Sequence, residues 1–177
     1  MKGHSRVSWL IAPLLGAGIL LLAVAQVSLM PWLHIGGITA DLLVATTVAV
    51  ALHFGPWSGL LWGLSLGVTA DVLAAHPLGV LAVPLGIVGY GAGLAHIWVL
   101  ESRILVPLLT GFGGALAYAL LQIPAVWIWG YPIGLAGSWL RDMTLMASYT
   151  AIWAWAFFLL LLLIHRLQRQ ERLRVHL

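Results

Sequence analysis

Four charged residues stand near the ends of long apolar segments, where they could pair with one another or bind a ligand. They are Asp41, Asp71, Arg141 and Asp142. If the segments alternate in direction across a membrane, all four fall near the outer end of one helical bundle, and we call them the outer polar cluster. A charge costs roughly 2.5–3.5 kcal/mol at the centre of a bilayer and less near its edge, so pairing of Arg141 with Asp71 or Asp41 would offset a real penalty. A structural ion pair and a binding site are equally compatible with this arrangement.

No other residues form a pattern typical of catalysis or metal binding. The seven histidines fall in expected loops or alone on their segments, and no two share a helix face at ligand spacing. The chain has no GxSxG turn, no GxxxxGK phosphate-binding loop and no cysteine. We therefore expect no enzyme activity, no catalytic residue, no metal site and no cofactor.

The composition is that of a protein whose solvent is lipid. Hydrophobic residues make up 62% of the 177 residues and charged residues only 7%, and the mean hydropathy is +1.05, far from an ordinary soluble domain. The run 156–164 is apolar on every face, which excludes the alternating pattern of a transmembrane β-barrel. The sequence predicts an all-α integral membrane protein. Eight Lys and Arg against five Asp and Glu are too few and too dispersed to favour nucleic acid as a partner.

The apolar segments predict a single transmembrane domain, residues 1–177, built as a bundle of about six helices. A helix needs roughly 20 apolar residues to cross the hydrocarbon core. Proline, glycine and charged residues separate the segments. The expected spans are about 7–30, 38–54, 57–75, 78–99, 104–129 and 142–165, followed by a basic tail, 166–177.

Basic residues beside the spans set the expected orientation. With six spans both termini lie on one side, which then holds Lys2, Arg6, Arg103 and the tail, and only Arg141 lies opposite. The positive-inside rule makes the basic side cytoplasmic. The first span also resembles a signal peptide, with small residues before Gln26. Cleavage would split the basic ends across the membrane, so retention is favoured, although the sequence alone leaves cleavage open.

Glycines recur at helical spacing in the third and fourth spans. In the third they are four residues apart, and in the fourth they fall seven apart with one additional GxxxG pair. Where lipid gives no hydrophobic drive for association, such bare ridges let two helices approach closely and gain van der Waals contact. Packing within the chain and docking of a partner's helix are both open. The glycines are Gly59, Gly63, Gly67, Gly79, Gly86, Gly89 and Gly93.

The stretch from Gly59 to Gly93 resembles the central signature of the bacterial rod shape-determining protein MreD family. It reads GLLWGLSLGVTADVLAAHPLGVLAVPLGIVGYGAG. The family shows spaced glycines, an Asp late in the third span, a Pro-Leu-Gly turn and a Gly-Tyr pair in the fourth span. Here these are Asp71, residues 77–79 and residues 89–90, and Asp41 with its two following leucines resembles the start of the family's second span.

The resemblance implies a non-catalytic scaffold of the bacterial cell-elongation complex, which directs rod shape and peptidoglycan synthesis. MreD associates there with the single-span protein MreC, the actin-like MreB, and the synthase pair of RodA and a class B penicillin-binding protein. These proteins and membrane lipid are therefore the expected partners, with MreC bound through the transmembrane helices. The expected location is the bacterial inner membrane, with both termini cytoplasmic.

A second class of protein stays open, because the six-helix layout is also similar to the substrate-binding components of ECF-type vitamin transporters. A vitamin pocket would use convergent polar groups on the outer side, which the outer polar cluster with His34 and His76 could provide. The first span lacks the Ala-x-x-x-Ala pattern with which those proteins usually dock their coupling subunit. The sequence leaves open which helix face binds a partner, the oligomeric state, and whether a small ligand lies between the spans.

Overall fold

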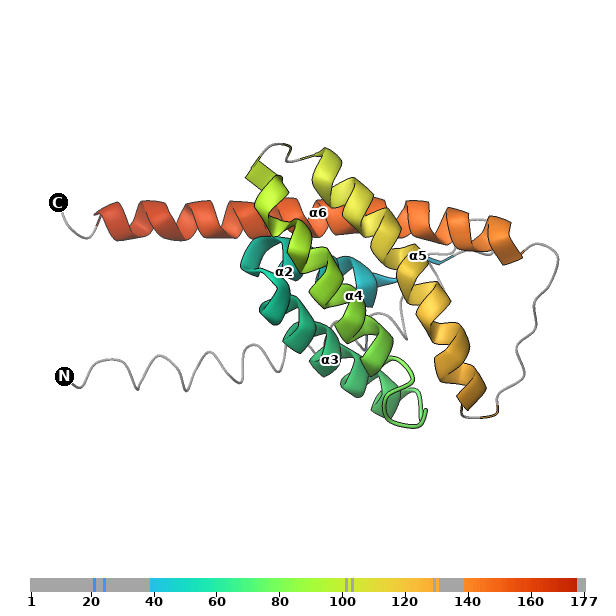
Figure 1. Cartoon of the computed structure of the whole chain (residues 1–177). Helices are drawn as coiled ribbons and strands as arrows, with labels where there is room; N and C mark the ends of the chain where they lie inside the picture. The colour runs from blue at the N-terminus through green and yellow to red at the C-terminus, as the bar shows by residue number, and fades with distance from the viewer. Residues whose placement is uncertain are drawn as a thin grey trace, which may run out of the picture.

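Helices form all the regular secondary structure in the part of the chain that the structure, a computed structural model, describes. That part comprises residues 21, 24, 39–100, 102, 104–128, 130 and 139–174. The predicted all-α class is confirmed there. The elements, in order, are α2 (Leu42–Phe54), α3 (Pro56–Leu73), α4 (Ala82–Leu94), the 3-10 helix η2 (Ala95–Leu100), α5 (Leu105–Ile128) and α6 (Trp139–Arg174) (Figure 1).

The five α-helices fall on the second to sixth expected spans. The first expected span, 7–30, with its cleavage site and the loop after it, lies outside the described residues apart from Leu21 and Val24, which are helical. The expected fourth span, 78–99, is divided, because its first residues belong to a turn and its last residues form η2. Helix α3 begins directly after Gly55, whose φ of 91° requires a residue without a side chain.

Two of the helices are long and apolar enough to cross a membrane by length and composition. These are the stretches Leu105–Ala125 of α5 and Leu140–Leu163 of α6. Helix α2 has 13 residues, or about 20 Å, which is shorter than the roughly 30 Å hydrocarbon core. Helix α4 also has 13 residues and gains length from η2. Six complete spans therefore remain a prediction.

Helix α6 extends beyond the expected end of the last span. It has 36 residues and reaches Arg174, whereas the hydropathy pattern predicts an end near His165 and a separate tail. Residues such as Gln, Glu, Arg and Leu are good helix formers, so the backbone continues as a helix after the apolar run stops. At 1.5 Å per residue α6 is about 54 Å long, and it runs past the other helices in Figure 1.

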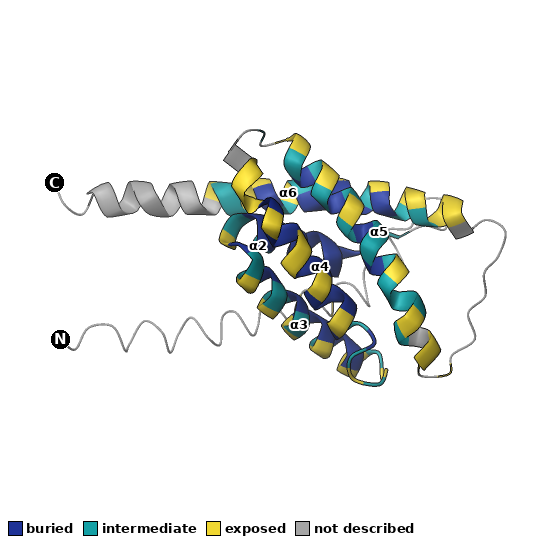
Figure 2. Cartoon of the chain, in the orientation of Figure 1, coloured by how far each residue is buried: buried dark blue, intermediate teal, exposed yellow. Residues whose placement is uncertain are grey.

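Helix α2 lies at the centre of the fold. It packs against α3, α4, α5 and α6, and neighbouring pairs around it also pack, namely α3 with α4, α4 with α5, and α5 with α6. Ten of its 13 residues are buried, and Figure 2 shows the dark blue of buried residues along α2 and on the inward sides of its neighbours. A helix that is apolar all round is expected in such a position.

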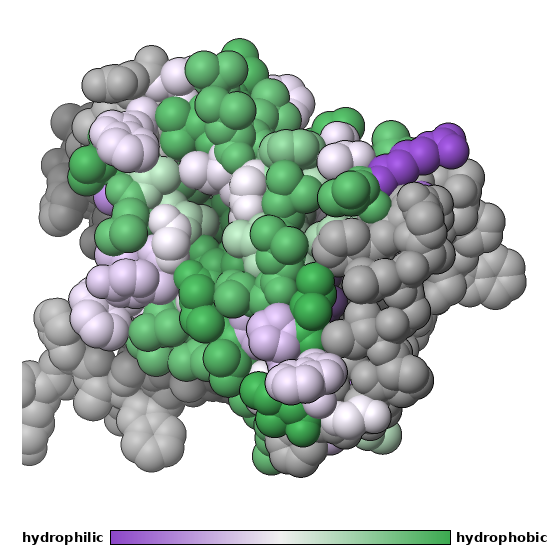
Figure 3. Space-filling view, turned by 45° about the vertical axis from the view of Figure 1, so that its right-hand side comes forward, coloured by the Kyte–Doolittle hydropathy of each residue, from purple (hydrophilic) through white to green (hydrophobic). Residues whose placement is uncertain are grey.

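The exterior of the bundle is apolar. Large hydrophobic side chains with half or more of their surface exposed occur on every helix around α2, among them Leu61, Val83, Leu109 and Ile152. Figure 3 shows hydrophobic residues covering most of the described surface on one face. Soluble proteins rarely expose contiguous apolar surface on this scale.

Candidate functional site

The spaced glycines of α3 face α4 inside the chain. A Cβ built on Gly63 would lie 2.5 Å from the backbone oxygen of Leu85, and one on Gly67 would collide with the Cα of Ala82. A Cβ on Gly59 would collide with the backbone oxygen of Gly89. The two backbones therefore touch at three successive turns of α3, and α3 and α4 form the most extensive helix pair of the bundle.

The helical glycines of α4 complete the contact from the other side. Gly89 meets the backbone of Gly59 and the methyl group of Thr47 on α2, and Gly93 meets Pro56 at the start of α3. A Cβ on Gly86 would lie 2.9 Å from the side chain of Leu64. We call these six residues of the two helices the glycine seam. The seam consists of Gly59, Gly63, Gly67, Gly86, Gly89 and Gly93.

Gly79, the seventh glycine of the predicted pattern, has a different function from helix packing. It lies in the turn between α3 and α4 with φ of 104°, a conformation that favours glycine. The nearest atom to a Cβ built there is a methyl carbon of Val83 at an ordinary contact distance of 3.8 Å. Its amide is bonded to the side chain of Asp71. Gly79 and Gly86 are seven residues apart, but they do not lie on the same face of one helix.

Asp71 holds the turn that joins α3 to α4. Its side chain is fully buried, and its oxygens accept hydrogen bonds from the amides of Gly79 at 2.9 Å, Leu81 at 3.0 Å and Ala82 at 3.3 Å. Ala82 is the first residue of α4, so the carboxylate also lies at a helix N-terminus, where a negative charge is favoured. One side chain therefore satisfies three backbone amide donors, two in the turn and one at the start of α4.

Asp41 performs a similar task at the start of α2. It is the N-cap residue, and its Oδ1 accepts from the amides of Leu43 at 2.9 Å and Val44 at 3.1 Å. Its own amide donates to the hydroxyl of Thr150 on α6 at 3.0 Å. Both Asp41 and Thr150 are buried. The cap therefore closes α2 and also fixes it to α6.

The outer polar cluster does not form one site. The carboxylates of Asp41 and Asp71 bond to backbone amides and not to Arg141, which is exposed with Asp142 in the first turn of α6. Asp41 and Asp71 thus form two separate capping sites, and neither makes the ion pair with Arg141 that the sequence left open. The remaining polar groups suggested for a vitamin pocket do not join them, because His76 is exposed and His34 lies outside the described residues.

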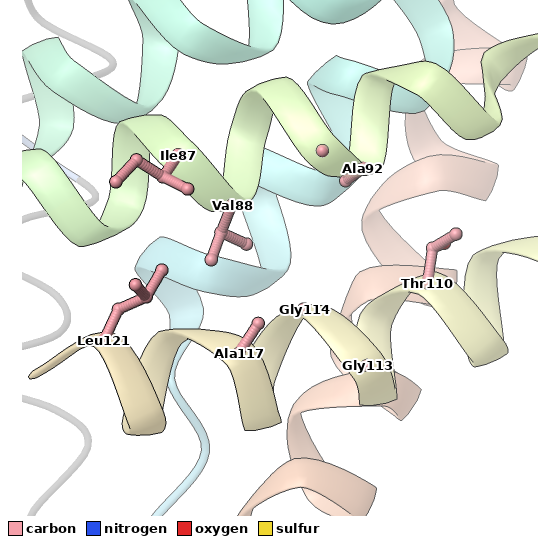
Figure 4. Close-up of a pocket in the computed structure, with 9 residues that line it drawn as sticks. Ile87, Val88, Ala92, Thr110, Gly113, Gly114, Ala117 and Leu121 are labelled. Atoms are coloured by element: carbon pink, nitrogen blue, oxygen red, sulfur yellow. The ribbon is translucent and has the colours of Figure 1, made fainter.

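An apolar groove of about 340 Å³ opens between α4 and α5. Figure 4 shows Ile87, Val88 and Ala92 of α4 facing Thr110, Ala117 and Leu121 of α5 across it. The hydroxyl of Thr110 donates to the backbone oxygen of Val106 at 2.6 Å, so it is satisfied within its own helix. We call this feature the α4/α5 groove.

Three glycines outside the predicted pattern line the α4/α5 groove, namely Gly91, Gly113 and Gly114. Nothing lies within 4 Å of a Cβ built on Gly91 or on Gly113, and both residues are exposed. Gly114 lies deeper, because a Cβ built on it would lie 3.1 Å from Val48 of α2 and 3.3 Å from Val88. The groove therefore has bare backbone on both of its walls, which α4 and α5 form.

Histidines contribute packing and no metal site in the described part of the chain. Among those residues no three His, Asp or Glu side chains lie close enough to hold a metal ion. His96 of η2 uses its Nδ1 to bond the backbone oxygen of Leu52 at the end of α2, at 2.5 Å.

Comparison with known protein families, with curated proteins and with solved structures finds no match for this chain.

Proposed function

We propose that the chain is a non-catalytic scaffold of the bacterial inner membrane that binds the transmembrane helix of MreC, as its resemblance to the MreD family implies. The elongation complex would then also bring MreB, RodA and a class B penicillin-binding protein to it. The apolar exterior and the two long apolar helices α5 and α6 support a membrane location.

The α4/α5 groove is the observation that carries the proposal. The glycine seam is fully used inside the chain, because any side chain at Gly63 or Gly67 would meet the backbone of α4. Gly91 and Gly113 are different, because space is open at both. Bare backbone on an exposed apolar surface is what a second transmembrane helix needs for close approach. We therefore assign the partner's helix to this groove.

The test is co-purification of MreC from bacterial membranes in mild detergent. Gly113→Leu fills the groove and is expected to reduce recovery of MreC at least tenfold while the chain itself accumulates normally. Leu109→Phe is the matched control, because Leu109 is exposed on the same helix but does not line the groove. Undiminished recovery of MreC with Gly113→Leu would contradict the proposed surface.

The same purification distinguishes the other class of function. A substrate-binding component of a vitamin transporter would bring down an ATPase module and a bound vitamin. Mass spectrometry of the purified wild-type material is expected to find elongation proteins instead. Recovery of the ATPase module without them would overturn the scaffold proposal.

A further inference from the structure

The α4/α5 groove and the glycine seam both consist of bare backbone, but they differ in what that backbone meets. At the seam a Cβ built on Gly63 would lie 2.5 Å from the backbone oxygen of Leu85, because two helices of the chain are already in contact there. At Gly91 and Gly113 nothing lies within 4 Å of a Cβ. The seam is therefore closed by backbone, whereas the groove is a hollow with room for side chains.

The volume of the groove sets the size of what can fill it. A cavity of about 150 Å³ lined by apolar side chains binds one benzene molecule. The groove has a volume of about 340 Å³, so it has room for roughly two large apolar side chains. A partner helix that presented only glycine and alanine would leave much of this volume empty, and the atoms that line an empty space lose their dispersion contacts. Large side chains on the partner would therefore gain more contact than a second row of small ones.

The small residues of the groove gather toward one end. In Figure 4, Ala92 and Gly113 lie toward the end marked by Thr110, while Ile87 and Leu121 lie toward the other end. Helix α4 passes into η2 shortly after Ala92, so the end with small residues is the one nearer η2. Few side-chain atoms extend into the groove at that end, and an entering side chain has the most room there.

The lining of the groove needs no polar partner. Thr110 carries the one polar side chain among the described residues that line it, and its hydroxyl already donates to the backbone oxygen of Val106. On α5 the lining includes residues 110, 114, 117 and 121, which are four, three and four residues apart. This spacing follows one face of a helix for about three turns, as at the contact between two helices that run nearly parallel. An occupant that fits the whole groove is therefore an apolar helix that lies along α5.

We infer that the partner's transmembrane helix binds by placing large apolar side chains, three or four residues apart, into the α4/α5 groove between Gly91 and Gly113. The inference rests on the proposed function and specifies the chemistry of the partner. The partner carries bulk at the contact, and this chain supplies the bare backbone on which that bulk packs. The contact differs in this way from the glycine seam, in which backbone meets backbone.

Substitutions of increasing size at Gly113 separate the two kinds of contact, with co-purification of the partner in mild detergent as the measurement. Gly113→Ala adds a methyl group where nothing lies within 4 Å, so recovery of the partner should stay within about twofold of the wild type, whereas Gly113→Leu should lower it roughly tenfold. Backbone-to-backbone contact predicts loss with either residue, because even a methyl group would separate the helices. Equal loss with Ala and Leu would overturn the inference and leave the proposed function standing.

An exchange of sizes between the two proteins completes the test. Each large apolar residue of the partner's transmembrane helix is replaced by Ala in turn and combined with Gly113→Leu. At least one combination should restore recovery to within about threefold of the wild type, because the shortened side chain leaves room for the new leucine. Failure of every combination would overturn the inference.

Gly91→Leu, on the opposite wall of the groove, repeats the series if the Gly113→Leu chain does not accumulate in the membrane. Undiminished recovery of the partner with both Gly113→Leu and Gly91→Leu would contradict the assignment of the groove itself, and with it the surface named in the proposed function. The two failures are thus distinguishable, because the first concerns only the size of the partner's side chains.

Discussion

At the scale of single residues, the two buried aspartates stabilise helix ends in apolar surroundings. Asp41 closes the N-terminus of α2, and Asp71 binds the turn and first amide of α4. Free amides at a helix start normally bond to water, which an apolar environment does not provide. Each carboxylate therefore replaces water as the hydrogen-bond acceptor at a helix start, Asp41 for α2 and Asp71 for α4.

Replacing Asp71 with Asn should destabilise the fold. The amide side chain offers one acceptor oxygen in place of two, and its NH2 group would face backbone donors. We expect Asp71→Asn to lower the free energy of unfolding by about 1–3 kcal/mol, seen as a lower melting temperature in detergent. Ser65→Ala, at an exposed position of the same helix, is expected to change it by less than about 0.5 kcal/mol. An unchanged melting temperature for Asp71→Asn would contradict the capping function.

The sequence identifies these aspartates but not their partners. Asp41 directly before an apolar helix is a recognisable N-cap pattern, although the sequence interpretation considered only an ion pair with Arg141 or a binding site. For Asp71 the donors are residues 79, 81 and 82, eight to eleven positions later. Their location depends on the turn, in which Ala75 with φ of 54° and Gly79 reverse the chain. Spacing alone does not contain that geometry.

At the scale of helices, glycines separate into those that join α3 to α4 and those that leave backbone open. Gly63→Ala should lower the free energy of unfolding by about 1–3 kcal/mol, because its Cβ meets backbone that has no freedom to move aside. Steric trapping or thermal unfolding in detergent measures this change.

Gly91→Ala is the matched substitution on the open side. Because nothing lies within 4 Å of the new methyl group, we expect unchanged or slightly higher stability, by up to about 1 kcal/mol from helix propensity. Equal losses for Gly63→Ala and Gly91→Ala would show that the glycine seam is not a tight backbone contact.

The glycine spacing predicts a ridge without side chains, but it does not predict which glycines contact the neighbouring helix. Gly89, Gly91 and Gly93 alternate along α4, and only the rotation of the helix decides that the first and third face α3 while Gly91 faces the groove. Likewise hydropathy locates α6 but misplaces its end, because the backbone stays helical where apolar residues stop. The apolar pattern predicts which residues lie in lipid, whereas the end of the helix depends on the helix propensity of each residue.

At the scale of the whole molecule, the described helices leave two apolar openings, the α4/α5 groove and a smaller cavity between α2, α3 and α6. The proposed function assigns the partner's helix to the groove, where bare backbone is open at Gly91 and Gly113. Binding of a helix there would not require the core around α2 to rearrange.

The proposed orientation can be measured with single cysteines in oriented membranes. A cysteine at Ser138, in the connection between α5 and α6, should react with an impermeant maleimide added to intact spheroplasts. A cysteine at Lys2 or Leu177 should react only after the membrane is opened. Labelling of both ends from outside would reverse the orientation, and labelling of one end would exclude an even number of spans.

Helix α6 connects distant parts of this arrangement without a break. It runs from Trp139 to Arg174, and about a third of the way along it the hydroxyl of Thr150 accepts a hydrogen bond from the amide of Asp41. Because an α-helix resists bending and stretching, it acts as a stiff lever whose fulcrum is the start of the central helix. A force applied to the arginine-bearing end of α6 would therefore tilt its other end, near Trp139. The force would be transmitted through the molecule without the unwinding of any helix.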